Sequence, residues 1–178
     1  VQNGVGVMTG AVNINVTCSA TRALFISPRG MALDGAGNLM VTDSGTIRMV
    51  SMSGRASTLA GEAGFTGAVD GLGAAARFDG LDDVVVDKSG FTYVSDSRNN
   101  TIRKINKSGL TQTWAGTAGV SGSVNGTGSS ALFKRPKGLV TDKSGNIFVA
   151  DSLNCVIRKI TLDGMVSTFA GLAGACGV

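Results

Sequence analysis

The residues best suited to chemistry in this sequence are acidic and basic side chains that recur in pairs. The aspartates are Asp43, Asp96 and Asp151, and the arginines that follow them are Arg48, Arg103 and Arg158. One carboxylate from each copy could form an acid/base ring or a metal-binding ring. Alternatively, each aspartate pairs with its arginine across a hairpin or caps backbone groups. We favour the structural interpretation, because a reaction site rarely needs the same residue from every copy of a repeat.

Other residues that commonly carry catalysis are scarce. The 178 residues include no histidine and one glutamate, Glu62. Hydrolases and lyases that use histidine and carboxylate constellations are therefore poor candidates. Gly-rich segments such as "VNGTGSS" lack the Walker phosphate-binding pattern. They are interpreted as flexible crossings between sheets, and no cofactor is expected.

Three cysteines, Cys18, Cys155 and Cys176, form no C-x-x-C pair. Without histidine, a zinc site built from ordinary ligand sets is not expected. The odd number of cysteines argues against a full disulfide framework. Cys155 occupies the position that Asn100 holds in the preceding copy, so it is interpreted as incidental rather than as a nucleophile.

The acidic and basic pairs belong to a tandem repeat. Ile-Arg dipeptides begin at Ile47, Ile102 and Ile157, which are 55 residues apart. The aspartates step by 53 and then by 55 residues, because the segment "DSGT" is two residues shorter than "DSRNNT". Loops tolerate such deletions, whereas strands would lose their register. Self-similarity at a fixed period indicates a repeat architecture.

Each copy divides into four short apolar runs. In the second copy they are "LDDVVVD", "FTYVSD", "TIRKI" and "LTQTWAG", separated by turn signals such as "DKSG" at 87–90. Runs of this kind predict strands, and four of them in sequence predict an antiparallel meander. One such sheet cannot bury both of its faces, but sheets stacked radially can. The predicted fold is all-β, a β-propeller with three four-stranded antiparallel blades per chain.

The third copy carries three motifs in order: a P-x-G motif at Pro136–Asp142, the run "GNIFVAD" at Gly145–Asp151, and "IRKI" at 157–160. With these motifs the copy resembles an NHL repeat, the propeller unit named for an Asn-His-Leu tripeptide. The resemblance covers about residues 22–171, since a dozen positions recur in all three copies.

The resemblance implies a function as well as a fold. NHL propellers typically serve as protein-interaction scaffolds, and some of them bind RNA. Related propellers include lyases and lactone hydrolases. The Asn of the tripeptide falls on Asn99 and Asn154, but its His position carries Asn100 and Cys155. We therefore predict a non-enzymatic scaffold for protein–protein interaction. An RNA-binding propeller and a small-molecule lyase or lactone hydrolase are the alternatives.

Three blades are expected to form half of a six-bladed propeller, because closed propellers have roughly four to eight blades. Three blades alone would leave two apolar end faces in water. A second copy placed head to tail, or missing repeats of a larger protein, would cover them. The predicted organisation is a connector at 1–21, blade one at 22–61, a connector at 62–77, blade two at 78–116, a connector at 117–132, blade three at 133–171 and a connector remnant at 172–178.

One rim of this assembly is predicted to bind a partner, because the loops between second and third strands share it with the long connectors. Its candidate binding residues are Arg98, Asn99, Asn100, Lys134, Arg135, Lys137, Leu153 and Asn154. Blade two adds the acidic residues Asp79, Asp82 and Asp83 to this rim. The mixed charge suits an anionic peptide, an RNA loop or another protein, and solvated surface charge is the simpler alternative. The net charge of +4 is too mild to indicate nucleic acid by itself.

Four N-x-[ST] sequons are candidate N-glycosylation sites, at Asn15, Asn99, Asn106 and Asn125. All four fall in predicted loops or turns, which favours a secreted or cell-surface location. No run of eighteen apolar residues occurs, so no membrane span is predicted. The chain starts at Val1 without a secretory pattern, as expected of a processed chain or an excised piece.

Overall fold

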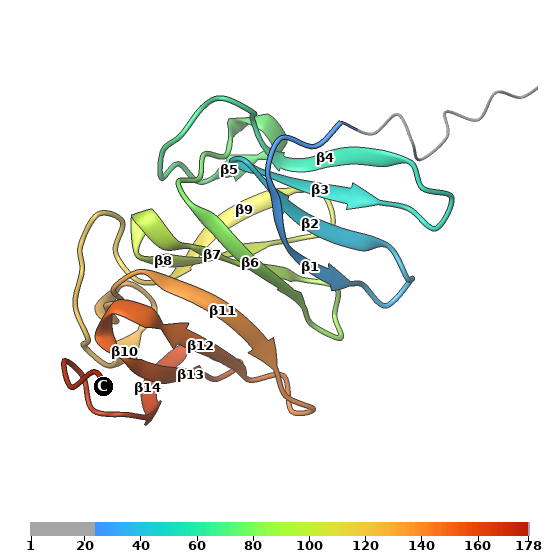
Figure 1. Ribbon diagram of the computed structural model, residues 1–178. Coiled ribbons are helices and arrows are strands. Elements are labelled where there is room, and N and C mark those ends of the chain that lie inside the picture. Colours follow the sequence, from blue (N-terminus) through green and yellow to red (C-terminus); the bar gives the residue numbers. More distant parts are fainter. Residues whose placement is uncertain (1–23, 178) are drawn as a thin grey trace, which may run out of the picture.

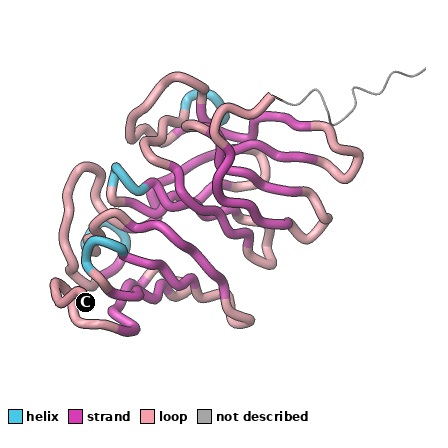
Figure 2. The backbone as a smooth tube through the Cα atoms, viewed as in Figure 1, coloured by secondary structure: helices cyan, strands magenta, loops and turns pink. Residues whose placement is uncertain are grey.

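The computed structural model describes residues 24–177, which form three antiparallel sheets (Figure 1). Figure 2 shows that nearly all regular structure is strand, with a few short helical turns. The predicted all-β fold with antiparallel sheets is therefore confirmed, and the arrangement is propeller-like. The sequon at Asn15, Cys18 and the predicted connector at 1–21 lie outside the described residues.

Sheet 1 contains four strands in the order of the chain. They are β1 (Pro28–Leu33), β2 (Leu39–Asp43), β3 (Thr46–Val50) and β4 (Ala56–Gly61). The first hairpin turns at the sequence "DGAG", where the Asp34 carboxylate accepts the backbone N–H of Ala36 at 2.9 Å and of Asn38 at 2.8 Å. This is the turn chemistry that the recurring D-x-x-G pattern predicts.

Sheets 2 and 3 each contain five strands. Sheet 2 is built from β5 (Gly71–Leu72), β6 (Leu81–Val86), β7 (Thr92–Asp96), β8 (Thr101–Ile105) and β9 (Leu110–Ala115). Sheet 3 is built from β10 (Gly126–Thr127), β11 (Pro136–Thr141), β12 (Ile147–Asp151), β13 (Val156–Ile160) and β14 (Met165–Ala170). The prediction of four strands is therefore wrong for these two sheets, since each connector adds a two-residue strand.

The extra strands change the interpretation of the connectors. β5 pairs with β9 and β10 pairs with β14, so each connector lies along the outer edge of the sheet that follows it. Short 3₁₀ turns follow these strands at η2 (Gly73–Ala75) and η4 (Gly128–Ser130). Two further 3₁₀ turns, η3 (Ser97–Asn99) and η5 (Ser152–Asn154), join second to third strands. The connectors are thus hydrogen-bonded parts of the sheets, where flexible crossings were predicted.

The three sheets stack face to face, with β1, β6 and β11 adjacent on their inner side (Figure 1). Alternation along each strand sends neighbouring residues to opposite faces. Val94 packs into the core between sheets 1 and 2, whereas Tyr93 packs into the core between sheets 2 and 3. Phe78 and Phe133 are fully buried in these two cores. Burial of one such ring contributes about 1.5–3 kcal/mol.

The Ala-Gly dipeptides that recur every 55 residues end the outer strands. At Gly116, φ is +93°, which favours glycine. A Cβ there would lie 2.5 Å from the carbonyl oxygen of Asn100. The dipeptide is therefore required by a tight backbone approach rather than by any chemistry of its own.

The two outermost faces of the stack are not covered by another sheet. On sheet 1, Met31 is 62% exposed and Leu33 is 66% exposed. On sheet 3, Val140 is 58% exposed and Phe169 is 62% exposed. The three sheets therefore do not close into a ring within residues 24–177. No helix in this part of the chain is long and apolar enough to cross a membrane.

Candidate functional site

The three recurring aspartates are buried, and so are the recurring arginines of sheets 2 and 3. Arg103 and Asp96 are both fully buried, with 2.8 Å between Nη1 and Oδ2. In sheet 3 the corresponding distance between Arg158 and Asp151 is 3.1 Å. Each pair is enclosed by its own sheet, so the aspartates do not converge on a shared centre. The geometry is that of a structural ion pair, and it offers no acid/base or metal ring.

Each arginine also fastens a connector to its sheet. Arg103 donates to the carbonyl of Arg77 at 3.0 Å and to that of Val69 at 2.9 Å. Its guanidinium lies 5.0 Å from the centre of the Phe78 ring. Arg158 makes the same set of contacts, to Leu132, Val124 and Phe133. This set of partners explains why Phe, Asp and Arg recur together.

The aspartates fix the chain just after the recurring phenylalanine. Asp96 Oδ1 accepts the backbone N–H of Asp79 at 2.7 Å, and Oδ2 accepts the Asn99 amide at 2.8 Å. Burial raises the pKa of the Asp96 carboxyl to about 6, although these bonds and the Arg103 cation favour its ionised form. Burial likewise raises the pKa of Asp151. Each carboxylate is fully buried and accepts three hydrogen bonds from its surroundings, so neither is accessible to a substrate.

Sheet 1 carries a looser version of this arrangement. Its turn between β2 and β3 is two residues shorter, and Arg48 Nη1 lies 3.8 Å from Asp43 Oδ2. The Arg48 side chain is 19% exposed, whereas its counterparts are fully buried. The ion pair is therefore weakest in the copy whose turn is shortest.

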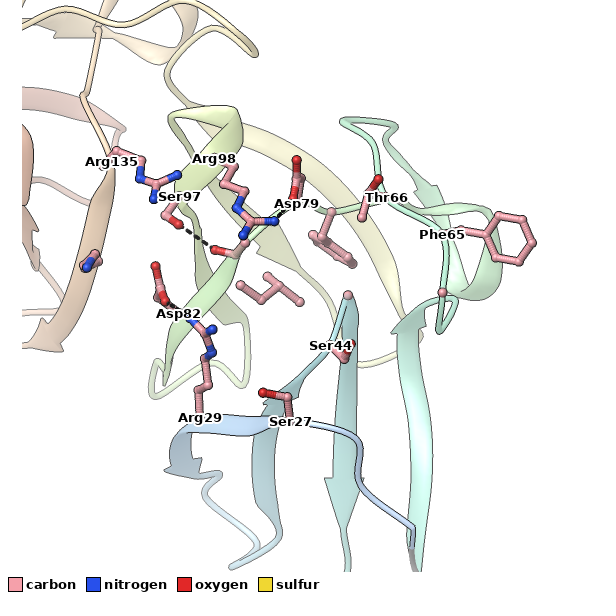
Figure 3. A pocket seen from close by; sticks show the side chains of 16 residues that line it. Ser27, Arg29, Ser44, Phe65, Thr66, Asp79, Asp82, Ser97, Arg98 and Arg135 are labelled. Atoms are coloured by element: carbon pink, nitrogen blue, oxygen red, sulfur yellow. Dashed lines mark hydrogen bonds and ion pairs between the residues drawn. The ribbon is translucent and has the colours of Figure 1, made fainter.

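A pocket of about 330 Å³ opens at the rim formed by the β2–β3 and β7–β8 turns and the connectors (Figure 3). We call it the rim pocket. All three sheets contribute to it, and its principal side chains are Ser27, Arg29, Ser44, Phe65, Thr66, Asp79, Asp82, Ser97, Arg98, Arg135 and Lys137. It lies on the rim where the sequence predicts partner binding.

Two ion pairs neutralise the acidic side chains of the rim pocket. Arg29 Nη1 lies 2.5 Å from Asp82 Oδ1, and Arg98 Nη1 lies 3.1 Å from Asp79 Oδ1 (Figure 3). Within residues 24–177, Arg135 and Lys137 have no acidic side chain at ion-pair distance. Both are exposed. The pocket therefore presents uncompensated positive charge on its sheet 3 side.

Arg135 adopts an unfavourable backbone conformation at this position. Its φ is +55°, in the left-handed region that residues with a Cβ adopt at a cost of about 1–2 kcal/mol. Sheet 2 has Gly80 at the matching position, with a φ of +78°. In sheets 2 and 3 the carbonyl at this position accepts a serine hydroxyl, from Ser97 and Ser152 respectively. The backbone thus needs this conformation, and sheet 3 has an arginine where glycine fits without strain.

Three of the candidate rim residues belong to the framework instead. Asn99 donates to Gly67 O at 2.7 Å and to Asp96, and Asn154 donates to Gly122 O at 2.6 Å. Asn100 Oδ1 accepts the backbone N–H of Arg135 at 2.9 Å. Their amide groups hold connectors and neighbouring sheets in place, so they are not directed at a partner.

The remaining candidates divide into two groups. Arg98, Arg135 and Lys137 line the rim pocket. Lys134 and Leu153 are exposed but lie outside it. Sequence reasoning missed Arg29, although the segment "PRG" at 28–30 aligns with "PKG" at 136–138 and could have revealed it.

The sequons differ in how accessible their amides are. The Asn99 side-chain nitrogen donates to two acceptors, so a glycan there would disrupt both contacts. Asn125 is exposed, and its Oδ1 accepts a hydrogen bond from Arg158 at 2.7 Å. Asn106 lies in the turn between β8 and β9, where its Oδ1 accepts the N–H of Ser108. Asn106 and Asn125 are therefore the sequons that the structure leaves most available.

Cys155 forms a disulfide with Cys176, and their Cα atoms are 5.2 Å apart. The interpretation of Cys155 as incidental is therefore wrong. Cys155 follows η5 with a φ of +60°, and Asn100 follows η3 with a φ of +58°, so the two residues occupy matching positions in their sheets.

No group of three or more metal-ligating side chains occurs in residues 24–177.

Comparison with known proteins defines the fold without supplying a family. No protein-family model matches the chain, and no curated protein matches it either. A solved protein of unknown function from Bacteroides thetaiotaomicron is 25% identical over 83% of this chain and 36% of its own, with a TM-score of 0.68.

Two other solved structures extend the likeness. A streptogramin B lyase is 17% identical over 85% of this chain and 42% of its own, with a TM-score of 0.60. An auxiliary nutrient binding protein from Bacteroides ovatus is 16% identical over 81% of this chain and 36% of its own, with a TM-score of 0.62. The chain thus spans less than half the length of each of these proteins. At such low identity the likeness shows a propeller-like fold and nothing further.

Proposed function

We propose that this chain is a non-enzymatic scaffold of the NHL propeller type, which binds an acidic segment of a protein partner at the rim pocket. The observation that carries the proposal is Arg135. The backbone requires this conformation for structural reasons, but an exposed arginine at a position where glycine fits without strain supports a hypothesis of function. With Lys137 it supplies positive charge that nothing in residues 24–177 neutralises. Arginine and lysine recognise carboxylates by charge-assisted hydrogen bonds.

A direct test uses a fluorescein-labelled peptide of six glutamates, followed by fluorescence polarisation at low ionic strength. A peptide of six glutamines is the uncharged comparison. We expect the acidic peptide to bind and the glutamine peptide not to bind. Arg135→Gly and Lys137→Ala should each weaken binding about threefold, as expected for exposed charge pairs.

The control variant is Lys143→Ala, which removes an exposed lysine from the turn between β11 and β12 on the opposite rim. It changes the net charge by the same amount as Lys137→Ala. If Lys143→Ala weakens binding equally, the peptide senses only the overall charge, and the rim pocket is not the site.

We further propose that the three sheets form half of a six-bladed ring. Val85 and Trp114 pack toward sheet 3 from sheet 2, and their counterparts on sheet 3 are the exposed Val140 and Phe169. The exposed Met31 of sheet 1 corresponds to Val84, which packs toward sheet 1 from sheet 2. The open face of sheet 3 thus matches the face that sheet 2 packs against sheet 3, and the open face of sheet 1 matches the face that sheet 2 packs against sheet 1. The two open faces together could form an interface of the kind that the molecule already contains twice. Such a pair suits head-to-tail closure, by a second copy or by further repeats.

Light scattering tests the closure by a second copy. We expect the particle measured in solution to have twice the mass of one 178-residue chain, and we expect the variant Phe169→Lys to be monomeric. Val120→Lys, which places a charge on another exposed apolar residue in a connector, should leave the dimer intact. A stable monomer of the unaltered chain would exclude the dimer and leave further repeats as the means of closure.

RNA binding is the second candidate, favoured by one observation. Phe65 is 56% exposed at the edge of the rim pocket, and a base could stack on its ring, whose centre lies 5.4 Å from the Arg77 guanidinium. Against it, Tyr93 is buried and Trp114 partly buried between sheets 2 and 3. A gel shift with single-stranded oligouridine tests whether the rim pocket binds RNA. RNA binding that is tighter than peptide binding, and is lost in Phe65→Ala, would favour the RNA function.

The non-enzymatic part of the proposal depends on the scarcity of proton-transfer groups. Glu62, the single glutamate, is bound to Arg77 at 2.6 Å. The buried Asp96 and Asp151 are occupied by their arginines. The streptogramin B lyase shares the fold with this chain, but this sequence contains no histidine.

We also propose a secreted or cell-surface location. The disulfide between Cys155 and Cys176 supports this, because disulfides persist in oxidising compartments. The available sequons at Asn106 and Asn125 agree with it. Expression in a secreting eukaryotic cell should give chains whose mass falls on glycosidase treatment. Loss of that shift in Asn106→Gln with Asn125→Gln would locate the glycans, and an unchanged mass in the unaltered chain would contradict their use.

A further inference from the structure

A second cavity, of about 460 Å³, lies between sheets 1 and 2 at the rim opposite the rim pocket. We call it the side pocket. Its inner wall is apolar and is formed by Met40, Met49 and Leu59 of sheet 1 and Val86 of sheet 2. Its volume falls in the range of about 300–1,000 Å³ that is usual for small-molecule sites.

The same place between sheets 2 and 3 is filled by aromatic rings. Tyr93 replaces Met40 and Trp114 replaces Leu59, and their ring centres are 4.6 Å apart. A smaller hollow of about 300 Å³ lies between the turns of these sheets, and neither ring lines it. The side pocket is therefore the space that aromatic rings occupy in the next interface.

The cation of the aromatic cluster is also replaced. Lys104 Nζ lies 4.1 Å from the centre of the Phe91 ring and 5.4 Å from that of Tyr93. Sheet 1 has Met49 at the position of Lys104 and Asn38 at that of Phe91. The wall of the side pocket is thus uncharged and polarisable, and methionine side chains adapt readily to the shape of a ring.

The mouth of the side pocket carries a net positive charge, from Lys88, Lys107 and Asp34. Lys107 lies across Gly90, and within residues 24–177 it has no acidic side chain at ion-pair distance. Lys88 donates its ammonium to the carbonyl of Lys143 at 2.8 Å. Asp34 is held by its own turn, where Asn38 Nδ2 donates to it at 2.9 Å. These hydrogen bonds leave Asp34 and Lys88 charged, so the mouth carries two ammonium groups and one carboxylate, and its net charge is positive.

We propose that the side pocket binds a small aromatic acid. The ring occupies the space between Met40, Met49 and Leu59, and the carboxylate faces Lys107. This site is separate from the rim pocket, so it can fail or succeed without affecting the proposed scaffold function.

The experiment uses NMR of the chain labelled with ¹³C at the methionine methyl groups, titrated with indole-3-acetate. Met40 and Met49 report on the side pocket, whereas Met31 lies on the open face of sheet 1 and Met165 on sheet 3. We expect saturable shifts of the Met40 and Met49 methyls with little change at Met31 and Met165. Equal shifts at Met31 would mean adsorption to the open apolar face and would overturn the proposal.

Two variants that copy sheet 2 fill the side pocket. Leu59→Trp introduces into sheet 1 an indole ring at the position that matches Trp114. Binding of indole-3-acetate should weaken by at least about tenfold, since fitting the ligand into a filled pocket would overpack it. Asn38→Phe fills the mouth instead, and it serves if Leu59→Trp does not fold. Unchanged Met165 shifts show that a variant is folded. Unaltered affinity in a folded filling variant would contradict the proposal.

Removing the Lys107 ammonium group tests separately how the carboxylate and the ring of the ligand are bound. Lys107→Gln should weaken indole-3-acetate about threefold, as for an exposed charge pair, and leave neutral indole unchanged. Lys143→Gln is the matched control and should affect neither ligand. An equal loss for both ligands in Lys107→Gln would contradict the assignment of the carboxylate to Lys107.

Discussion

Sheets 1 and 2 are two copies of one unit that keep the same framework and differ in what fills it. Both place an aspartate at the end of the second strand and an arginine on the third. In sheet 2 the ion pair is fully buried, whereas in sheet 1 the arginine is partly exposed. Elsewhere in sheet 2, Tyr93, Trp114 and Lys104 pack together on the face toward sheet 3, and sheet 1 has methionine and leucine at the matching positions. The comparison teaches that the backbone pairing tolerates these differences, and that cavities arise where the filling is smaller.

The largest expected effect comes from breaking the fully buried ion pair. Arg103→Met leaves the Asp96 carboxylate buried without its cation, which should lower the free energy of unfolding by about 3–5 kcal/mol. Arg48→Met should cost less, because the two charges are 3.8 Å apart and Arg48 is partly exposed, although Asp43 is buried. Urea unfolding measures the loss of stability in each variant. Equal losses would show that the ion pairs of sheets 1 and 2 contribute equally to stability.

A second test concerns the residue that follows the 3₁₀ turn in each sheet. Asn100 ties sheet 2 to the chain ahead by a hydrogen bond to Arg135, whereas Cys155 ties sheet 3 to Cys176 by a disulfide that closes a 21-residue loop. Reduction should lower the free energy of unfolding by about 3 kcal/mol. Cys155→Ser should cause a similar loss and make the protein insensitive to reductant. A response of Cys155→Ser to reductant would point to a different pairing.

Trp114→Leu would make the second interface resemble the first. It removes a partly buried ring that contacts Tyr93 and should cost about 2–3 kcal/mol in the free energy of unfolding, less than for truncating a fully buried tryptophan to alanine, because leucine keeps part of the contact. Indole should restore part of that stability by occupying the new space. Thermal unfolding with and without indole measures both effects, and the absence of any gain from indole would mean that the interface collapses.

The smallest expected effect compares Arg135 with Gly80. Arg135→Gly should raise the free energy of unfolding by about 1 kcal/mol, because glycine adopts the left-handed conformation without strain. It should also weaken binding of the acidic peptide. Gly80→Ala should lower the free energy of unfolding, since the added Cβ would lie 2.8 Å from Arg98 Cγ. A loss of stability in Arg135→Gly would contradict the strain argument.

The strands could be predicted from the sequence because each is short, apolar and bounded by a turn signal. The rim that carries the pocket was also predictable, because strand order determines which loops meet. The connectors were not, because "GAVDGLGAAARF" is rich in glycine and alanine and its order depends on Arg103, a residue far along the chain.

The details of the site depended on geometry that no local pattern contains. Asn99 and Arg98 are adjacent in the sequence, yet the first turns inward to Gly67 and the second lines the rim pocket. The disulfide was missed for a similar reason. Cys176 is 21 residues from Cys155, and only the folded path of the chain brings the two together.

The position of β5 determines where one structural unit begins. This short strand precedes β6 in the chain but pairs with β9, the last strand of the same sheet. A fragment that started at Phe78 would therefore lack both the outer edge of its sheet and the carbonyl partners of Arg103. The natural cutting point is just after the Ala-Gly dipeptide at 60–61, so a single module that is to be transplanted or expressed alone should run from residue 62 to residue 116.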